Sequence, residues 1–136
     1  MFRGMIGVVV LSILAGMTPA QSDEVMDVET VIRDQVAAFQ IDDFAGAFTF
    51  ASPTIRGIFQ TPETFGAMVR EGYPMVWRPS DLRFAQRMER GGRVYQTIVA
   101  TDASGVPHRL EYEMIPTDDG WKINGVRLLT APQVGA

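Results

Sequence analysis

The spacing of hydrophobic positions changes near the middle of the chain, and the first half predicts helices. From residue 25 to about residue 40, apolar side chains recur at steps of three and four residues, which is typical of an amphipathic helix: Val28, Val31, Ile32, Val36 and Phe39. A second, shorter helix is expected over residues 42–51, with Asp42 as its N-cap and Ser52-Pro53 at its end. Residues 56–59 are expected to form a short strand or an extended link.

The clearest helix signals lie at residues 61–72. Thr61 suits an N-cap, Pro62 suits the first helical position, and Gly72 suits the C-terminal cap. The segment that follows, Tyr73 to Pro79, contains two prolines around three large apolar side chains. We expect it to be a stiff aromatic connector between the helices and the second half of the chain.

From Asp81 onward apolar and polar residues alternate, which predicts strands. Gly91-Gly92 and residues 102–105 and 117–120 are turn signals, so four strands follow one another, and Asn124-Gly125 is expected to place a bulge in the last. The pattern predicts an α+β domain, with three N-terminal helices packed on the dry face of a curved four-stranded, or slightly larger, antiparallel sheet. Strong curvature would make that face a cone closed by the helices.

Residues 1–20 have the order of a secretory signal peptide. Arg3 provides a positive start, Met5 to Met17 is an apolar run too short for a comfortable membrane span, and Thr18-Pro19-Ala20 precedes a polar stretch. We therefore expect cleavage near Ala20, one domain over residues 21–136, and a periplasmic or secreted protein with no membrane attachment afterwards. An uncleaved membrane tether is the alternative, because the cut site is not a typical Ala-x-Ala.

The composition excludes several kinds of site. The chain has no cysteine and one histidine, so a thiol nucleophile, a thiolate metal site and a multi-histidine zinc site are all excluded. The net charge of −4 argues against nucleic acid as a partner. We expect neither a metal nor a cofactor.

Several stretches resemble known families. The closing GWKINGV, Gly120 to Val126, resembles the final-strand signature of the nuclear-transport-factor-2-like superfamily, a cystatin-like cone in which a tryptophan and an aliphatic side chain point inward. Three longer stretches resemble a family of small bacterial exported proteins known only as a domain of unknown function: VIRDQVAAFQIDDFAGAFTFASPTIRGIF, TPETFGAMVREGYPMVWRP and YEMIPTDDGWKINGVRLL. The resemblance implies the cone fold and transfers no catalytic residue.

Four residues are candidates for binding a ligand: Tyr73, Trp77, Arg78 and Tyr112. Aromatic rings beside a guanidinium suit a ligand with an apolar body and an anionic group, and Tyr112 would add a hydroxyl inside the pocket. The more ordinary interpretation is that residues 75–77 plug the open end of the cone as core, and that Tyr112 is a buried tyrosine bonded to the backbone.

Acid and base groups are few in this sequence. His108 shares a strand face with Tyr112 if the strand alternates regularly, but an edge or capping role is the commoner one. The pair Asp42-Asp43 is more typical of a helix cap than of two catalytic carboxylates. We therefore assign no catalytic residue. The alternative is a small cone-fold isomerase or hydrolase that uses Tyr112, His108 or a pocket carboxylate.

An arginine stripe is expected on the wet face of the sheet, where glutamates share the region: Arg83, Arg87, Arg90, Arg93 and Arg109, with Glu89, Glu111 and Glu113. Cross-strand ion pairs explain this pattern. The same face offers a possible polar homodimer interface. The leading prediction is a non-catalytic exported domain that binds a small amphipathic ligand in the cone, or a protein partner through the sheet.

Overall fold

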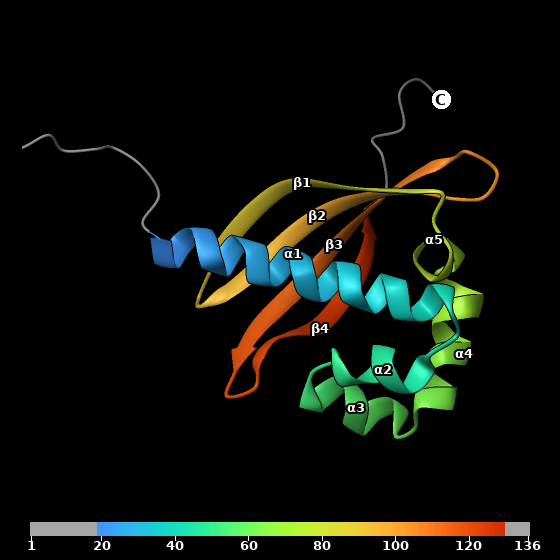
Figure 1. The fold of residues 1–136 in the computed structure, drawn as a ribbon, viewed down its shortest axis with the longest axis horizontal. Helices are drawn as coiled ribbons and strands as arrows, with labels where there is room; N and C mark the ends of the chain where they lie inside the picture. Colours follow the sequence, from blue (N-terminus) through green and yellow to red (C-terminus); the bar gives the residue numbers. More distant parts are fainter. Residues whose placement is uncertain (1–18, 130–136) are drawn as a thin grey trace, which may run out of the picture.

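The computed structural model describes residues 19–129, apart from the side chains of residues 19–22 and 26. The predicted export segment, residues 1–20, thus lies outside the described residues except for the backbone of its last two positions. Five helices precede four strands (Figure 1): α1 (Pro19–Gln40), α2 (Phe44–Thr49), α3 (Pro53–Phe59), α4 (Pro62–Gly72), α5 (Pro74–Trp77), β1 (Asp81–Arg90), β2 (Arg93–Thr101), β3 (Pro107–Thr117) and β4 (Gly120–Leu129). Within this described range, no helix is both long and apolar enough to cross a membrane.

The four strands form one antiparallel sheet in the order β1-β2-β3-β4. Figure 1 shows α1 lying along one face of this sheet, with α2, α3 and α4 gathered below its C-terminal half and α5 leading into β1. The predicted α+β class and four-stranded antiparallel meander are confirmed.

The prediction of three helices is wrong, because two short segments expected as links are helical. Helix α2 ends at Thr49, and Ser52 begins the next helix: its hydroxyl accepts the Ile55 N–H and caps α3, with Pro53 in the first turn. Residues 56–59 therefore belong to a helix. Similarly, Pro74 begins α5 inside the expected connector. Serine followed by proline is a helix-start signal, and at this position it overrides the extended pattern.

The cap of α2 also differs from the prediction by one residue. Asp43, not Asp42, is the N-cap, and its carboxylate accepts the Gly46 N–H at 3.0 Å. Asp42 instead has a φ of 56°, in the left-handed region, and turns the chain between α1 and α2. This frees the Asp42 side chain for contacts elsewhere.

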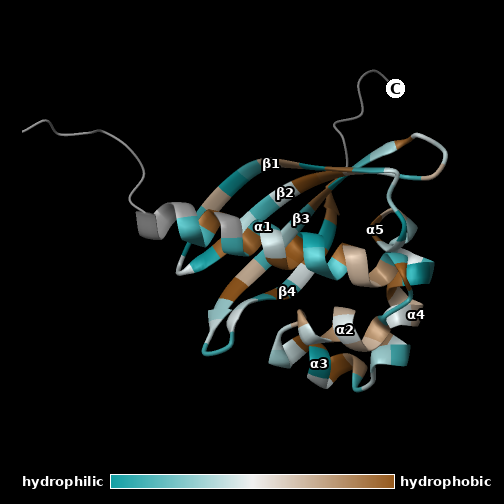
Figure 2. Ribbon diagram, viewed as in Figure 1, coloured by the Kyte–Doolittle hydropathy of each residue, from teal (hydrophilic) through white to brown (hydrophobic). Residues whose placement is uncertain are grey.

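The core lies between α1 and the sheet. Four of the five residues of the predicted stripe are buried in α1, each at most 5% exposed: Val28, Ile32, Val36 and Phe39. The fifth, Val31, is half-buried. The facing side of the sheet comes from alternate positions of the two central strands: Val94, Gln96, Ile98 and Ala100 of β2, and Leu110, Tyr112 and Met114 of β3. Figure 2 shows hydrophobic and hydrophilic positions following one another along these elements, as the sequence pattern predicts.

A bulge in β1 exchanges the two faces of the sheet to which the residues of its second half point. Phe84 pairs with Ile98 and Arg87 with Gln96, so two residues of β1 lie opposite one of β2. The Gln96 amide donates to the carbonyls of Ala85 and Gln86, both at 3.3 Å, and holds the bulge.

The bulge corrects the expected place of Arg87 and Met88. Arg87 turns to the helix-covered face, where its side chain is 16% exposed and pairs with Glu24 at 3.5 Å and with Glu89 at 3.0 Å. Met88, which regular alternation would place on the same face as Leu82 and Phe84, lies 52% exposed on the outer face. Regular alternation does not reveal an extra residue, and for this reason the sequence pattern misplaces both.

Candidate functional site

A cavity of about 220 Å³ lies between the helices and the C-terminal strands. Residues of α1, α3, α4, α5, β3 and β4 line it, together with Ala51 before α3: Gln35, Phe39, Ala51, Ile55, Phe59, Phe65, Met68, Val69, Tyr73, Val76, Tyr112, Ile123, Gly125 and Val126. Most of these side chains are apolar, and none is a carboxylate, lysine, arginine or histidine. The lining therefore suits an apolar molecule.

The helical wall is fixed by local signals and by aromatic packing. Thr61 caps α4 by accepting the Thr64 N–H at 3.2 Å, and Pro62 follows in the first turn, so the helix presents Phe65 to the core. The Phe65 ring lies 5.8 Å from that of Phe39 and 5.7 Å from that of Phe59, centroid to centroid. These offset and edge contacts connect three of the helices around the cavity.

A close approach of α2 to α4 completes the helical wall. Gly66 is buried on α4, and a Cβ there would clash with the ring of Phe44 at the start of α2. Only glycine allows this spacing without a shift of one helix.

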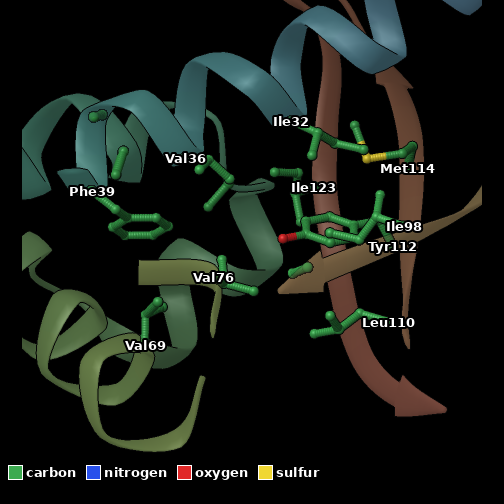
Figure 3. Close-up of a cluster of buried hydrophobic side chains, with 14 of the residues drawn as sticks. Ile32, Val36, Phe39, Val69, Val76, Ile98, Leu110, Tyr112, Met114 and Ile123 are labelled. Carbon is green, nitrogen blue, oxygen red and sulfur yellow. The ribbon is translucent and has the colours of Figure 1, made fainter. Parts of the chain in front are cut away.

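The sheet wall carries the most unusual polar group. Tyr112 is fully buried on the inner face of β3, and its hydroxyl has no hydrogen-bond partner among the described residues. Figure 3 shows the ring projecting from the sheet with its oxygen toward the helices that carry Val36 and Val76. Burial raises the pKa of the Tyr112 phenol, and nearby Tyr73 adds to the shift, so the group is protonated at neutral pH.

The other two polar side chains of the lining each donate a hydrogen bond to the backbone. The Gln35 amide donates to the carbonyl of Ala47 at 3.2 Å, which ties α1 to α2. The Tyr73 hydroxyl donates to the carbonyl of Val126 at 3.4 Å and connects the end of α4 to β4. Tyr112 is the lining side chain that is fully buried without any hydrogen bond among the described residues.

A bulge in β4 shapes the floor of the cavity and confirms the prediction for Asn124-Gly125. Glu113 pairs with Gly125 and Met114 with Ile123, which leaves Asn124 as the extra residue. The segment before α3 joins the sheet at this point: Ser52 N–H donates to the carbonyl of Ile123 at 2.8 Å, and the Ile123 N–H donates to the carbonyl of Phe50 at 2.9 Å.

The four predicted ligand residues separate into two places. Tyr73 and Tyr112 line the cavity. Trp77 and Arg78 are not in its lining; both bond Asp42, through Trp77 Nε1 to Oδ1 and Arg78 Nη2 to Oδ2, each at 3.0 Å, and the guanidinium lies 4.3 Å from the Trp77 ring centroid. The guanidinium of Arg78, which was expected at the mouth of the ligand site, therefore pairs with Asp42 in the turn between α1 and α2.

His108 is also outside the cavity lining. Its Nε2 lies 2.8 Å from Oδ2 of Asp102 at the β2–β3 turn. Hydrogen bonds from His108 and from the Val106 N–H lower the pKa of the Asp102 carboxyl. Within residues 19–129, no three histidine or carboxylate side chains are grouped so that they could hold a metal ion.

Sequence reasoning missed several lining residues. Gln35 occupies a position of the apolar stripe of α1, and a polar residue in such a stripe is a usable signal. Ile55 and Phe59 were missed because residues 56–59 were expected to be extended; the Ser52-Pro53 cap would have revealed their helix. Val126 reaches the cavity through the register that the β4 bulge sets.

Comparison with known proteins gives a fold and a family. The structure resembles the solution structure of RPA3114, a SEC-C motif containing protein from Rhodopseudomonas palustris, with a TM-score of 0.58 and 17% identity over 82% of this chain and 85% of that chain. At this identity the likeness shows the fold alone. No curated protein sequence matches the chain. The resemblance to the nuclear-transport-factor-2-like superfamily stays a prediction.

The family model described as a domain of unknown function (DUF4864) matches residues 21–136. This range is the whole of the predicted domain, and the match confirms the resemblance to a family known only by such a description. The chain therefore belongs to the DUF4864 family.

Proposed function

We propose that this protein is an exported, non-catalytic binding protein that holds a small, mainly apolar ligand in the cavity between its helices and its sheet. The cavity carries the proposal. Its lining is almost entirely apolar, and about 220 Å³ exceeds the roughly 150 Å³ of an engineered apolar cavity that accepts benzene. In this proposal the cavity is the interior of the predicted cone, and the helices cover its open end.

Binding is favoured over catalysis because of the lining chemistry. General acid–base catalysis needs a positioned acid or base with a suitable pKa. The cavity lining has no histidine or carboxylate, and the only histidine of the chain contacts Asp102 elsewhere. The isomerase or hydrolase alternative would depend on Tyr112 alone.

Binding is tested by a panel of small apolar probes against the protein without residues 1–20. Benzene, toluene and indole are titrated by NMR, and methyl signals of Val69 and Val76 are expected to shift. Ala51→Leu and Val126→Phe, which add bulk at two positions of the lining, should abolish the shifts, whereas Val106→Leu on an exposed turn should not. Failure of all probes to shift cavity signals would contradict the proposal.

Export forms a separate part of the proposal, and it rests on residues 1–20. A cut near Ala20 is compatible with the fold, because the first buried side chain described in α1 is Val28. Fractionation of cells that express the full chain, with mass spectrometry of the amino terminus, should find a start near Gln21 outside the cytoplasm. Val9→Arg, which interrupts the apolar run, should keep the chain inside. A start at Met1 in the wild type would contradict cleavage.

The polar homodimer through the outer face of the sheet is a less favoured candidate. Glutamates on that face already have partners within the chain: Glu113 pairs with Arg93, and Glu111 pairs with Arg127 at 3.0 Å. A second copy is not needed to neutralise them. Sizing chromatography at low and high salt tests this candidate, since a polar dimer would dissociate as salt screens its charges.

A further inference from the structure

We propose that the cavity selects an uncharged ligand whose single hydrogen-bond acceptor, such as a carbonyl or ether oxygen, accepts a hydrogen bond from the Tyr112 hydroxyl. The inference rests on the proposed binding function and names the class of ligand. An uncharged ligand takes the place of the ligand with an anionic group that the sequence suggested, because Arg78 contacts Asp42 and does not line the cavity.

The unused donor is the first observation. Buried hydroxyl groups in proteins are nearly always hydrogen-bonded, to protein or to ordered water. Tyr112 has 0% exposure and no partner among the described residues, and it lines the cavity. Because this oxygen is fully buried, a ligand atom would reach and satisfy it by displacing a neighbouring side chain of the lining.

The unused group acts as a donor at neutral pH. Burial in apolar surroundings raises the pKa of Tyr112, so the phenol keeps its proton. An oxygen or nitrogen acceptor therefore suits the site, whereas a cation or a group that can only donate hydrogen bonds does not.

The neutrality of the ligand follows from the rest of the lining. No lining residue carries a formal charge at neutral pH, and the Gln35 amide and Tyr73 hydroxyl donate to backbone carbonyls. An ionised carboxylate or ammonium placed here would lose its hydration without an opposite charge.

Size restricts the ligand further. A cavity of about 220 Å³ has room for one six-membered ring and a short substituent, since roughly 150 Å³ suffices for benzene. Acetophenone, ethylbenzene and benzoate have this size and differ in the group that Tyr112 would meet: a neutral acceptor, no acceptor, and an anion.

The test compares the three probes in the wild type and in Tyr112→Phe at neutral pH, by NMR titration. The wild type should bind acetophenone about 3- to 10-fold more tightly than ethylbenzene, the effect of one hydrogen bond. Tyr112→Phe should bind both equally, and neither protein should bind benzoate. Tyr95→Phe, on the outer face of the sheet and outside the lining, is the matched control and should keep the preference for acetophenone.

Infrared spectroscopy gives a readout that does not depend on the variant folding. The carbonyl stretch of acetophenone bound to the wild type should lie lower than in hexane, as expected for a hydrogen-bonded ketone. Equal affinities for acetophenone and ethylbenzene, or an unshifted carbonyl band, would overturn the inference and leave the proposed function standing. If benzoate binds as tightly as acetophenone, the inference that the ligand is uncharged would be overturned. Failure of both neutral probes to bind would overturn the proposed function and this inference with it.

Discussion

The side-chain amide of Asn124 donates to Oε2 of Glu113 at 3.0 Å, across the bulge of β4. The same side chain accepts the Ser52 hydroxyl at 2.8 Å, and Ser52 caps α3. On the other side, Glu113 accepts from Arg93 and from the Tyr95 hydroxyl. One extra residue in an edge strand thus joins the outer face of the sheet to the helix that carries Ile55 and Phe59 in the cavity lining.

Asn124→Ala is expected to destabilise the fold by about 1–3 kcal/mol, because it leaves the buried Ser52 hydroxyl and one Glu113 oxygen without this partner. Denaturant unfolding measures the loss. The control is Arg127→Ala on the same strand, which removes an exposed ion pair with Glu111 and should cost less than about 1 kcal/mol. Equal losses in the two variants would contradict the bridging role of Asn124.

Glu113 should make stability depend on pH. Hydrogen bonds from Arg93, Asn124 and Tyr95 lower the pKa of Glu113 below the ordinary 4.5. A carboxyl whose pKa is lowered by folding stabilises the protein above its unfolded pKa, and this contribution is lost as the pH falls through the folded value. The free energy of unfolding of the wild type should fall more steeply from neutral pH to below the ordinary pKa than that of Glu113→Gln.

Glu71→Gln, on the exposed side of α4, is the control for this pH series and should keep the wild-type slope. If Glu113→Gln also keeps that slope, the carboxylate does not hold its partners in solution.

Two tyrosine-to-phenylalanine changes should act in opposite directions. Tyr112→Phe removes a buried hydroxyl without a described partner, so the ligand-free protein should be as stable as the wild type or more stable, by up to about 1–3 kcal/mol. Tyr95→Phe removes a hydrogen bond to the Glu113 carboxylate and should cost about 1–2 kcal/mol. Thermal and denaturant unfolding check both; a clear loss in Tyr112→Phe would mean that the hydroxyl has a partner.

The β1 bulge predicts different tolerance at two methionines. Met88→Lys should change the free energy of unfolding by less than about 0.5 kcal/mol, because the side chain lies on the outer face. Met114→Lys, at a fully buried position of β3, should prevent folding, since it places an unpaired charge in the core. Circular dichroism and urea unfolding measure the outcomes. Unfolding of Met88→Lys would show that β1 alternates without a bulge.

Asp42 contributes through its side chain, while its backbone conformation is costly. Asp42→Gly loses the contacts to Trp77 and Arg78 but suits the φ of 56°; Asp42→Ala loses the contacts and keeps the strained backbone. Alanine should therefore be less stable than glycine by about 1–2 kcal/mol. Both should change the fluorescence of Trp77. Equal stability of the two variants would contradict the left-handed conformation.

Much of the fold was predictable because its signals are local. The stripe from Val28 to Phe39, the Thr61-Pro62 start of α4 and the Gly91-Gly92 turn each depend on neighbours within a few residues, and the structure confirms all three. The Asn124-Gly125 bulge belongs to the same group. Helices α3 and α5 were missed because a cap signal and an extended pattern compete over fewer than eight residues.

The candidate site was only half predictable for a related reason. Aromatic and basic residues close in sequence, Tyr73, Trp77 and Arg78, suggest one ligand mouth. The short helix α5 separates them, so that Tyr73 faces the cavity while the other two face Asp42. Which residues share a site depends on the direction of each side chain, and a helical Pro74–Trp77 directs these side chains differently from an extended connector.

The sequence by itself determined the class of the fold, the order of its strands, the family, and the absence of thiol and multi-histidine chemistry. These follow from periodicity, turn residues and composition, which need no long-range information. Only the tertiary structure decided that a cavity is left between α1, α4 and the sheet, that the Tyr112 hydroxyl is buried beside it without a described partner, and that Arg87 points inward. Each of these depends on how side chains distant in sequence meet, and on a bulge that shifts the register by a single residue.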